Sequence, residues 1–328
     1  MACRGSGVQV PSAPHVDWNE EMIEIPRGWN ATDIPQLSGK RFLITGATSG
    51  IGKEAARQLI RAGGDVIITA RTDEKGQATV AELGKGRVTY EKLDLTSLAS
   101  VRELSARITH DIDVLILNAG VMATPLAKTQ DGFELQMGTN HLGHFALAGL
   151  LRARVRDRIV SVASQAHRMG NFNDGSIATI REKALGQGAY KPWAAYGASK
   201  LANLLFINEL HRRSTANNWK ITGLVVHPGW SATNLQTVGP AMRGAFLEER
   251  VSSAMNSLLA QSASRGALPT LCAATFPGLE SSTYIGPDGL FEMRGFPRLT
   301  RAISSAYDPS LGANLWKVSE ELTGVTWH

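Results

Sequence analysis

The chain has 328 residues, of which 43% are hydrophobic and 19% are charged, and its formal net charge is +5. This balance excludes a disordered chain, and the length allows one large domain or two ordinary ones. Because the positive excess is small for this length, it indicates no nucleic-acid partner.

The sequence gives no sign of membrane insertion, secretion or metal binding. No apolar run reaches the roughly 20 residues of a membrane-spanning helix, so we expect no transmembrane segment. The N-terminus lacks the apolar block of a secretory signal. Cys3 and Cys272 are far apart and follow no disulfide or metal-ligand spacing. We therefore expect a cytoplasmic protein without a bound metal.

The first 37 residues differ in composition from the rest of the chain. They carry scattered glycine and proline residues and little apolar periodicity. We expect residues 1–37 to form a flexible arm and residues 38–328 to form one domain. Translation could start at Met22, or the residues before it could be a native flexible tail. The sequence does not distinguish these two alternatives.

From Lys40 onward, short apolar runs alternate with amphipathic stretches of helical length. The apolar runs that we interpret as strands cover 42–45, 66–70, 88–93, 114–117, 159–163, 221–226 and 282–285. Stretches such as 53–62 and 98–108 separate them and have helical spacing. Near-continuous apolar strands joined by helices indicate a parallel sheet that is covered on both faces. The predicted fold is α/β, with a doubly wound, mostly parallel Rossmann sheet in a single domain.

A glycine-rich turn, TGATSGIG at 45–52, follows the first strand. Gly46 allows a sharp turn, Gly50 allows close approach of a pyrophosphate, and Gly52 allows the next helix to pack tightly on the strand. The helix N-terminus then offers free N–H groups to phosphate. A purely structural glycine turn is the alternative. The dinucleotide-binding residues expected here are Gly46, Ser49, Gly50, Ile51 and Gly52.

Arg71 ends the second strand, where this fold meets the adenosine ribose. An acidic residue at this point would bind the 2′-hydroxyl of NAD, whereas a guanidinium suits the 2′-phosphate of NADP. We therefore expect NADP, with NAD as the alternative cofactor. An ordinary surface arginine is the competing interpretation.

Two further strand ends carry candidate cofactor residues. Asp94 follows the third strand and either accepts a hydrogen bond from the adenine amino group or caps the next helix. Asn118, Ala119 and Gly120 follow the fourth strand. Asn118 either ties neighbouring strands together or lines the cofactor site.

Tyr196 and Lys200 are four residues apart in YGASK, so they share one face of a predicted apolar helix over 201–210. A positive charge about 4 Å from the phenol would favour the phenolate by about 4 kcal/mol at an effective dielectric constant near 20. This predicts a lowered pKa for Tyr196 and a role in acid–base chemistry.

Ser164 and Asn140 complete the candidate catalytic group. Ser164 ends the fifth strand, where the ligand site of such sheets lies, and its hydroxyl can bond a carbonyl or carbinol oxygen. Asn140 lies in a helical stretch before that strand, where we expect it either to kink the helix and hold a water or to be a plain helix residue.

Taken together, these motifs resemble the short-chain dehydrogenase/reductase family, from about Gly39 to Gly324. The resemblance implies that Tyr196 is the general acid/base, and that Lys200 binds the nicotinamide ribose and lowers the tyrosine pKa. It also implies that Ser164 orients the substrate oxygen and Asn140 supports a proton relay. The residues expected near the nicotinamide are Pro228, Gly229 and Thr233.

Finer features resemble the retinol dehydrogenase-like and WW-domain oxidoreductase-like branch. The stretches that carry this likeness are 140–145, 164–167, 196–206 and 227–235. Ala163 stands where the branch usually has a second serine, which leaves the assignment of Ser164 open. The segment 170–193 is longer than in the simplest members, and we expect it to shape the substrate side.

The substrate itself is not specified by these motifs. An apolar stretch after Pro228 predicts a lid and an apolar aldehyde, ketone or alcohol as the small-molecule partner. The lid residues expected in this stretch are Trp230, Leu235, Val238, Met242 and Phe246. The sequence leaves open whether the protein forms a homo-oligomer.

The alternative functions are a non-catalytic NADP(H) sensor on the same fold and a nucleotide-sugar epimerase. A metal site at His141 and His144 lacks a third ligand.

Overall fold

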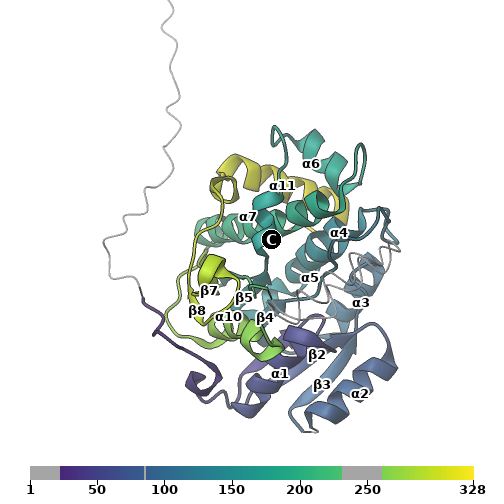
Figure 1. The fold of residues 1–328 in the computed structure, drawn as a ribbon. Coiled ribbons are helices and arrows are strands. Elements are labelled where there is room, and N and C mark those ends of the chain that lie inside the picture. The colour runs from purple at the N-terminus through teal and green to yellow at the C-terminus, as the bar shows by residue number, and fades with distance from the viewer. Residues whose placement is uncertain (1–22, 85, 231–260) are drawn as a thin grey trace, which may run out of the picture.

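Eight strands form one sheet in the computed structural model, which describes residues 23–84, 86–230 and 261–328 (Figure 1). The spatial order is β3-β2-β1-β4-β5-β6-β7-β8, in which all neighbouring pairs are parallel except β7 with β8. The strands are β1 (Arg41–Ile44), β2 (Asp65–Ala70), β3 (Val88–Lys92), β4 (Ile112–Leu117), β5 (Val155–Val162), β6 (Thr222–Val226), β7 (Tyr284–Pro287) and β8 (Pro297–Leu299). The predicted doubly wound, mostly parallel sheet is confirmed.

Helices cover both faces of the sheet (Figure 1). One layer consists of α1 (Gly50–Arg61), α2 (Asp73–Leu83) and α10 (Ala263–Thr275). The other contains α3 (Leu98–Arg107), α4 (Leu135–Met137), α5 (Gly143–Leu151), α6 (Ile177–Ala184), α7 (Pro192–Asn217) and α11 (Pro309–Thr323). Single helical turns complete the elements: η1 (Ala31–Asp33), η2 (Gly138–Leu142), η3 (Arg152–Arg154), η4 (Gln165–Met169), η5 (Leu290–Glu292) and η6 (Ser304–Tyr307).

The strands are apolar almost throughout because successive side chains enter different cores. Phe42 and Ile44 of β1 pack against the layer of α1 and α10, whereas Leu43 between them packs against the layer of α3 and α5. Burial of both faces explains why the strands appear in the sequence as continuous apolar runs and not as an alternating pattern.

The element boundaries differ from the prediction where the apolar signal is weak. β5 begins at Val155, four residues before the expected start, because Arg156 and Arg158 belong to its polar first half. α7 begins at Pro192, whose fixed φ suits the first helical position. β8 has only three residues and includes Arg298, so it gave no apolar run that could be recognised.

The expected boundary of the flexible arm at residue 37 is wrong. Ile25, Trp29 and Leu37 are each at most 6% exposed and belong to the core that α1 and α10 share. The backbone N–H of Leu37 also donates to the carbonyl of Ala62 just after α1, at 2.8 Å. These few large apolar side chains bury area despite their irregular spacing. Residues 1–22 lie outside the described part of the chain.

The packing of this segment predicts a large effect of Trp29→Ala. Removing a buried tryptophan side chain should lower the free energy of unfolding by about 3 kcal/mol or more. Chemical denaturation measures this change. The control is Ile23→Ala, since Ile23 is 42% exposed and should cost about 0.5 kcal/mol. Equal stability of Trp29→Ala and wild type would show that residues 23–37 do not pack on the domain and belong to the flexible arm.

Candidate active site

The turn between β1 and α1 needs glycine at two positions. Gly46 has a φ of +66°, and a Cβ on it would lie 2.8 Å from the Cα of Ala119. A Cβ on Gly52 would lie 2.4 Å from Nδ2 of Asn118 and 2.8 Å from the carbonyl oxygen of Gly46. The predicted sharp turn and close packing are therefore present.

The first turn of α1 is left without a side-chain cap. Ser49 occupies the N-cap position, but its side chain makes no capping hydrogen bond. Gly50 begins the helix with a φ of +57°, and Ile51 after it lines the large pocket described below. Uncapped N–H groups at a helix N-terminus suit an anionic phosphate.

Thr45 joins the end of β1 to the end of β4. Its hydroxyl accepts the backbone N–H groups of Asn118 at 2.9 Å and Ala119 at 3.0 Å, and lies 2.8 Å from Nε2 of His144. Burial lowers the pKa of His144 to about 4, so this imidazole is neutral at pH 7. Since Nδ1 of His144 donates to the carbonyl of Asn140 at 3.0 Å, Nε2 accepts from Thr45.

His141 and His144, the two candidate metal ligands, both have hydrogen-bond partners within the protein. Besides the contacts of His144, Nε2 of His141 lies 2.8 Å from Oγ of Ser319. Among the described residues, no group of three His, Cys, Asp or Glu side chains could hold a metal ion.

Asn118 makes the structural contact that was the alternative to cofactor binding, whereas Asp94 does not cap α3 as its alternative required. Nδ2 of Asn118 donates to the carbonyls of Thr45 at 2.8 Å and Gly46 at 3.3 Å, which ties β4 to the glycine turn. Oδ1 of Asp94 accepts from the N–H and hydroxyl of Thr96 at 2.9 and 2.8 Å. Asp94 thus closes a turn before α3, while Ser97 is the N-cap of that helix.

Arg71 lies exposed at the end of β2. Within the described residues, no hydrogen bond or ion pair engages its guanidinium. The neighbouring Thr72 caps α2 through the N–H of Lys75, so Asp73 and Glu74 lie in the first helical turn. Their charges are favourable there because of the helix dipole.

The irregularity expected at Asn140 is present as the π-helical turn η2. Oδ1 of Asn140 accepts from the N–H of Val121 at 2.8 Å. Nδ2 donates to the carbonyl of Val121 and to Oγ of Ser199, both at 2.9 Å. The amide thus links the strand-end loop after β4 to α7. A Cβ on Gly120 would come within 3.0 Å of Oδ1 of Asn140.

Tyr196, Ser164 and Lys200 lie together at the carboxyl end of β5. Tyr196 and Lys200 are 4% and 3% exposed on the same face of α7, and Nζ lies 5.8 Å from the centroid of the phenol ring. Nζ donates to the carbonyl of Val162 at 2.9 Å. Ser164 hydrogen-bonds the side chain of Tyr196, whereas Ala163 is buried beside it. Of positions 163 and 164, only Ser164 has a hydroxyl, and this hydroxyl contacts Tyr196.

The predicted direction of the tyrosine pKa shift is wrong in this structure. Burial raises the pKa of Tyr196 to about 12, and the hydrogen bond with Ser164 opposes this rise only partly. Burial also lowers the pKa of Lys200 to about 8. The Lys200 ammonium donates its hydrogen bond to the carbonyl of Val162. Desolvation of the Tyr196 phenol therefore outweighs the attraction between the ammonium and a phenolate.

A pocket of about 770 Å³ opens beside Tyr196 and Ser164. Its larger apolar lining residues include Ile51, Met122, Met169, Trp193, Trp230, Phe291 and Met293. The turn between β7 and β8 supplies Phe291, Glu292 and Met293, which the sequence analysis missed. No motif marks this turn, because only the return of the chain to the sheet brings it to the pocket.

The expected contribution of segment 170–193 is confined to its end. Trp193 lines the pocket, but α6 within the segment packs against α11. Arg181 of α6 forms an ion pair with Glu321 of α11, with a shortest distance of 2.7 Å. The insertion therefore mainly extends the helical layer.

Pro228 and Gly229 follow β6 and line the same pocket. Gly229 has a φ of +64°, and a Cβ there would lie 2.4 Å from the carbonyl oxygen of Met293. The turns 228–230 and 290–293 therefore pack directly on each other. Thr233 and the expected lid residues, Leu235, Val238, Met242 and Phe246, lie outside the described residues.

Comparison with known proteins establishes the family of the chain. A family model of short chain dehydrogenases matches residues 40–243. The chain belongs to the short-chain dehydrogenase/reductase family. It is 33% identical to retinol dehydrogenase 14 of Mus musculus, over 88% of this chain and 87% of the relative. It is 36% identical to human retinol dehydrogenase 11, over 90% and 89%. These similarities place it in the retinol dehydrogenase-like branch.

Solved structures of this family share the fold. An uncharacterized protein from Mycobacterium paratuberculosis is 40% identical with a TM-score of 0.77, over 92% of this chain and 99% of that one. A short chain dehydrogenase from Burkholderia cenocepacia in complex with NADP is 23% identical with a TM-score of 0.57, over 76% and 96%. In the described part of this chain, none of the helices combines the length and apolar character that crossing a membrane requires.

The buried ammonium of Lys200 predicts a pH-dependent stability. Its pKa is about 8 in the folded protein against 10.5 for an ordinary lysine, so the folded state binds fewer protons between these values. The free energy of unfolding of wild type should therefore rise with pH in this window, relative to Lys200→Met, by up to about 3 kcal/mol.

Chemical denaturation between pH 7.5 and 10.5 measures this difference. Lys317→Met, at an exposed position of α11, is the matched control. A difference between wild type and Lys200→Met that stays constant with pH would show that burial does not disfavour the charged lysine.

Proposed function

We propose that this protein transfers hydride between NADP(H) and the carbonyl or alcohol carbon of an apolar small molecule, with Tyr196 as the general acid/base. The observation that supports this most directly is the presence of Tyr196 and Ser164 in the lining of a largely apolar pocket, with Lys200 beside the ring of Tyr196. Its relatives are named dehydrogenases, and the family assignment makes it an oxidoreductase.

The residues around the glycine turn fit a dinucleotide. Positions 46 and 52 exclude a Cβ, and the first turn of α1 lacks a side-chain cap. Together they would hold the pyrophosphate, with Arg71 at the ribose and Pro228 and Gly229 at the nicotinamide. When bound, the nicotinamide supplies or accepts the hydride. A Burkholderia protein of the same fold was crystallised with NADP, which supports this choice of cofactor.

The protonation states favour proton donation by Tyr196. With a pKa of about 12, its phenol carries a proton at neutral pH and can donate it to a carbonyl oxygen during reduction. Ser164 is placed to orient the same oxygen. Lys200 is mostly charged at pH 7 and would stabilise the phenolate that forms. Asn140 positions α7 through Ser199.

The pocket lining supports an apolar substrate. Methionine, tryptophan, phenylalanine and isoleucine account for seven of its lining residues. Retinol, the alcohol in the names of the relatives, is itself apolar. We also infer a cytoplasmic location. Cys272 is a free, buried thiol, as is usual in a reducing compartment.

Tyr196→Phe tests the acid–base role. This variant keeps the ring but loses the proton donor, so turnover of a carbonyl substrate with NADPH should fall by about 100-fold or more. Binding of NADPH, followed by its fluorescence, should be almost unchanged. Tyr90→Phe, on the distant strand β3, is the control. Undiminished kcat in Tyr196→Phe would exclude the assignment, and NADPH binding by wild type without any turnover would favour the sensor alternative.

Arg71→Ala tests the cofactor preference. A charge-assisted hydrogen bond to the 2′-phosphate contributes roughly tenfold to hundredfold in affinity, so NADPH binding should weaken by that factor. NADH binding should change little, because NADH lacks this phosphate. Titration of both cofactors into wild type, Arg71→Ala and the control Arg61→Ala measures the effect. Equal losses for NADPH and NADH would mean that Arg71 does not recognise the phosphate.

A further inference from the structure

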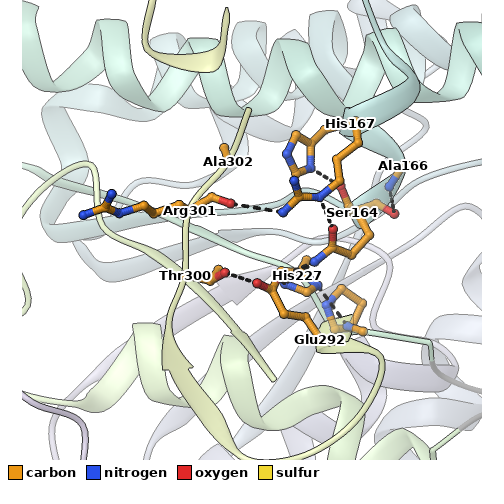
Figure 2. A network of polar contacts seen from close by, with 12 residues as sticks. Ser164, Ala166, His167, His227, Glu292, Thr300, Arg301 and Ala302 are labelled. Carbon is orange, nitrogen blue, oxygen red and sulfur yellow. Dashed lines mark hydrogen bonds and ion pairs between the residues drawn. The ribbon is translucent and has the colours of Figure 1, made fainter. Parts of the chain in front are cut away.

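Glu292 is the centre of a polar network that joins three segments of the pocket wall (Figure 2). Its Oε2 lies 3.0 Å from Nε2 of His227, just before the Pro228–Gly229 turn. The same oxygen accepts from Nε2 of Gln165, the neighbour of Ser164, and Oε1 accepts from the hydroxyl of Thr300. Three donors therefore converge on one carboxylate.

The hydrogen-bond directions require an ionised glutamate and a neutral histidine. The N–H of Gly229 donates to Nδ1 of His227 at 3.3 Å, so Nε2 of this ring carries the proton that Glu292 accepts. Burial raises the pKa of Glu292, but the bonds from His227 and Thr300 outweigh it and lower that pKa to about 2. Burial lowers the pKa of His227.

The turn that carries Glu292 is strained. Phe291 and Glu292 have φ values of +51° and +55°, in the left-handed region that residues with a Cβ rarely adopt. Two successive residues of this kind cost free energy that the surrounding contacts must offset. The hydrogen bonds of Glu292 and the bond from the N–H of Trp230 to the carbonyl of Met293, at 2.7 Å, supply such contacts.

This strained turn forms the outer wall of the pocket. Phe291 lines the pocket and is 79% exposed, so it lies at the mouth, whereas Tyr196 at the floor is 4% exposed. Because Phe291 and Met293 line the same pocket as Tyr196, a substrate long enough to extend from Tyr196 to the mouth would lie against them. A short one occupies only the floor.

We propose that Glu292 is a positioning residue that sets the selectivity of the pocket for long apolar substrates, by holding turn 290–293 against His227, Gln165 and Thr300. This inference rests on the proposed function, because it concerns the same pocket. The hydrogen bonds of Glu292 are to His227, Gln165 and Thr300, which carry neither the proton donor nor the substrate-orienting hydroxyl of the proposed function. Its effect is on the wall that a long substrate touches.

The test compares dodecanal with butanal in wild type and Glu292→Gln. An amide has one oxygen, and its NH₂ group would face a donor, so at least one of the three bonds is lost. We expect kcat/KM for dodecanal to fall about tenfold through KM, on the scale of one hydrogen bond to a charged group. Butanal should change less than about twofold, and the pH profile of kcat should be unchanged. Glu280→Gln, at an exposed loop position, is the control.

A binding measurement separates this inference from the proposed function. Trp193 and Trp230 line the pocket, so their fluorescence reports the binding of dodecanol without turnover. If wild type reduces no aldehyde with NADPH or NADH, but Glu292→Gln weakens dodecanol binding about tenfold, the proposed function fails, while the role of Glu292 in shaping the pocket wall for a long apolar ligand is supported.

Two outcomes overturn the inference. One is an equal loss for dodecanal and butanal, which indicates a merely structural role. The other is unchanged dodecanol affinity in a folded Glu292→Gln protein. If that variant does not fold, Thr300→Val removes a single donor and keeps the glutamate. It should reduce the preference for dodecanal in the same direction, and an unchanged preference excludes the proposal.

Discussion

Burial of the Lys200 ammonium beneath Tyr196 is the constraint on which the site depends. A charged group that is 3% exposed and bonded to the carbonyl of Val162 costs free energy, and it persists because α7 is fixed firmly against β5. Asn203 donates to the same carbonyl at 3.2 Å. The helix that carries Tyr196 thus has one well-defined position relative to Ser164.

The carboxyl ends of the central strands are joined by side chains before any ligand is considered. Thr45, Asn118 and His144 connect β1, β4 and α5, and Asn140 extends this connection to α7. Each of these polar groups is paired as its burial requires. Because the network consists of short hydrogen bonds between rigid elements, the glycine turn and Tyr196 are held at one edge of the sheet.

The two halves of the sheet contribute differently to the site. β1, β2 and β4 end in residues suited to a dinucleotide, with little side-chain bulk at Gly46, Gly52 and Gly120. β5, β6 and the β7–β8 turn surround the apolar pocket. Under the proposed function, variation in the β7–β8 turn would change the substrate side and leave the cofactor side intact, which is typical of loops on an α/β scaffold.

Seven of the eight strands, the glycine turn and the grouping of Tyr196, Lys200, Ser164 and Asn140 could be predicted from the sequence. These features depend on local periodicity, on the steric needs of glycine and on residue positions at strand ends or along one helix. The tertiary structure alone decided the burial of Trp29, the pairing of β8 and the placement of Glu292 and Phe291 at the pocket. It also reversed the pKa expected for Tyr196, because desolvation depends on side chains that pack from distant parts of the chain.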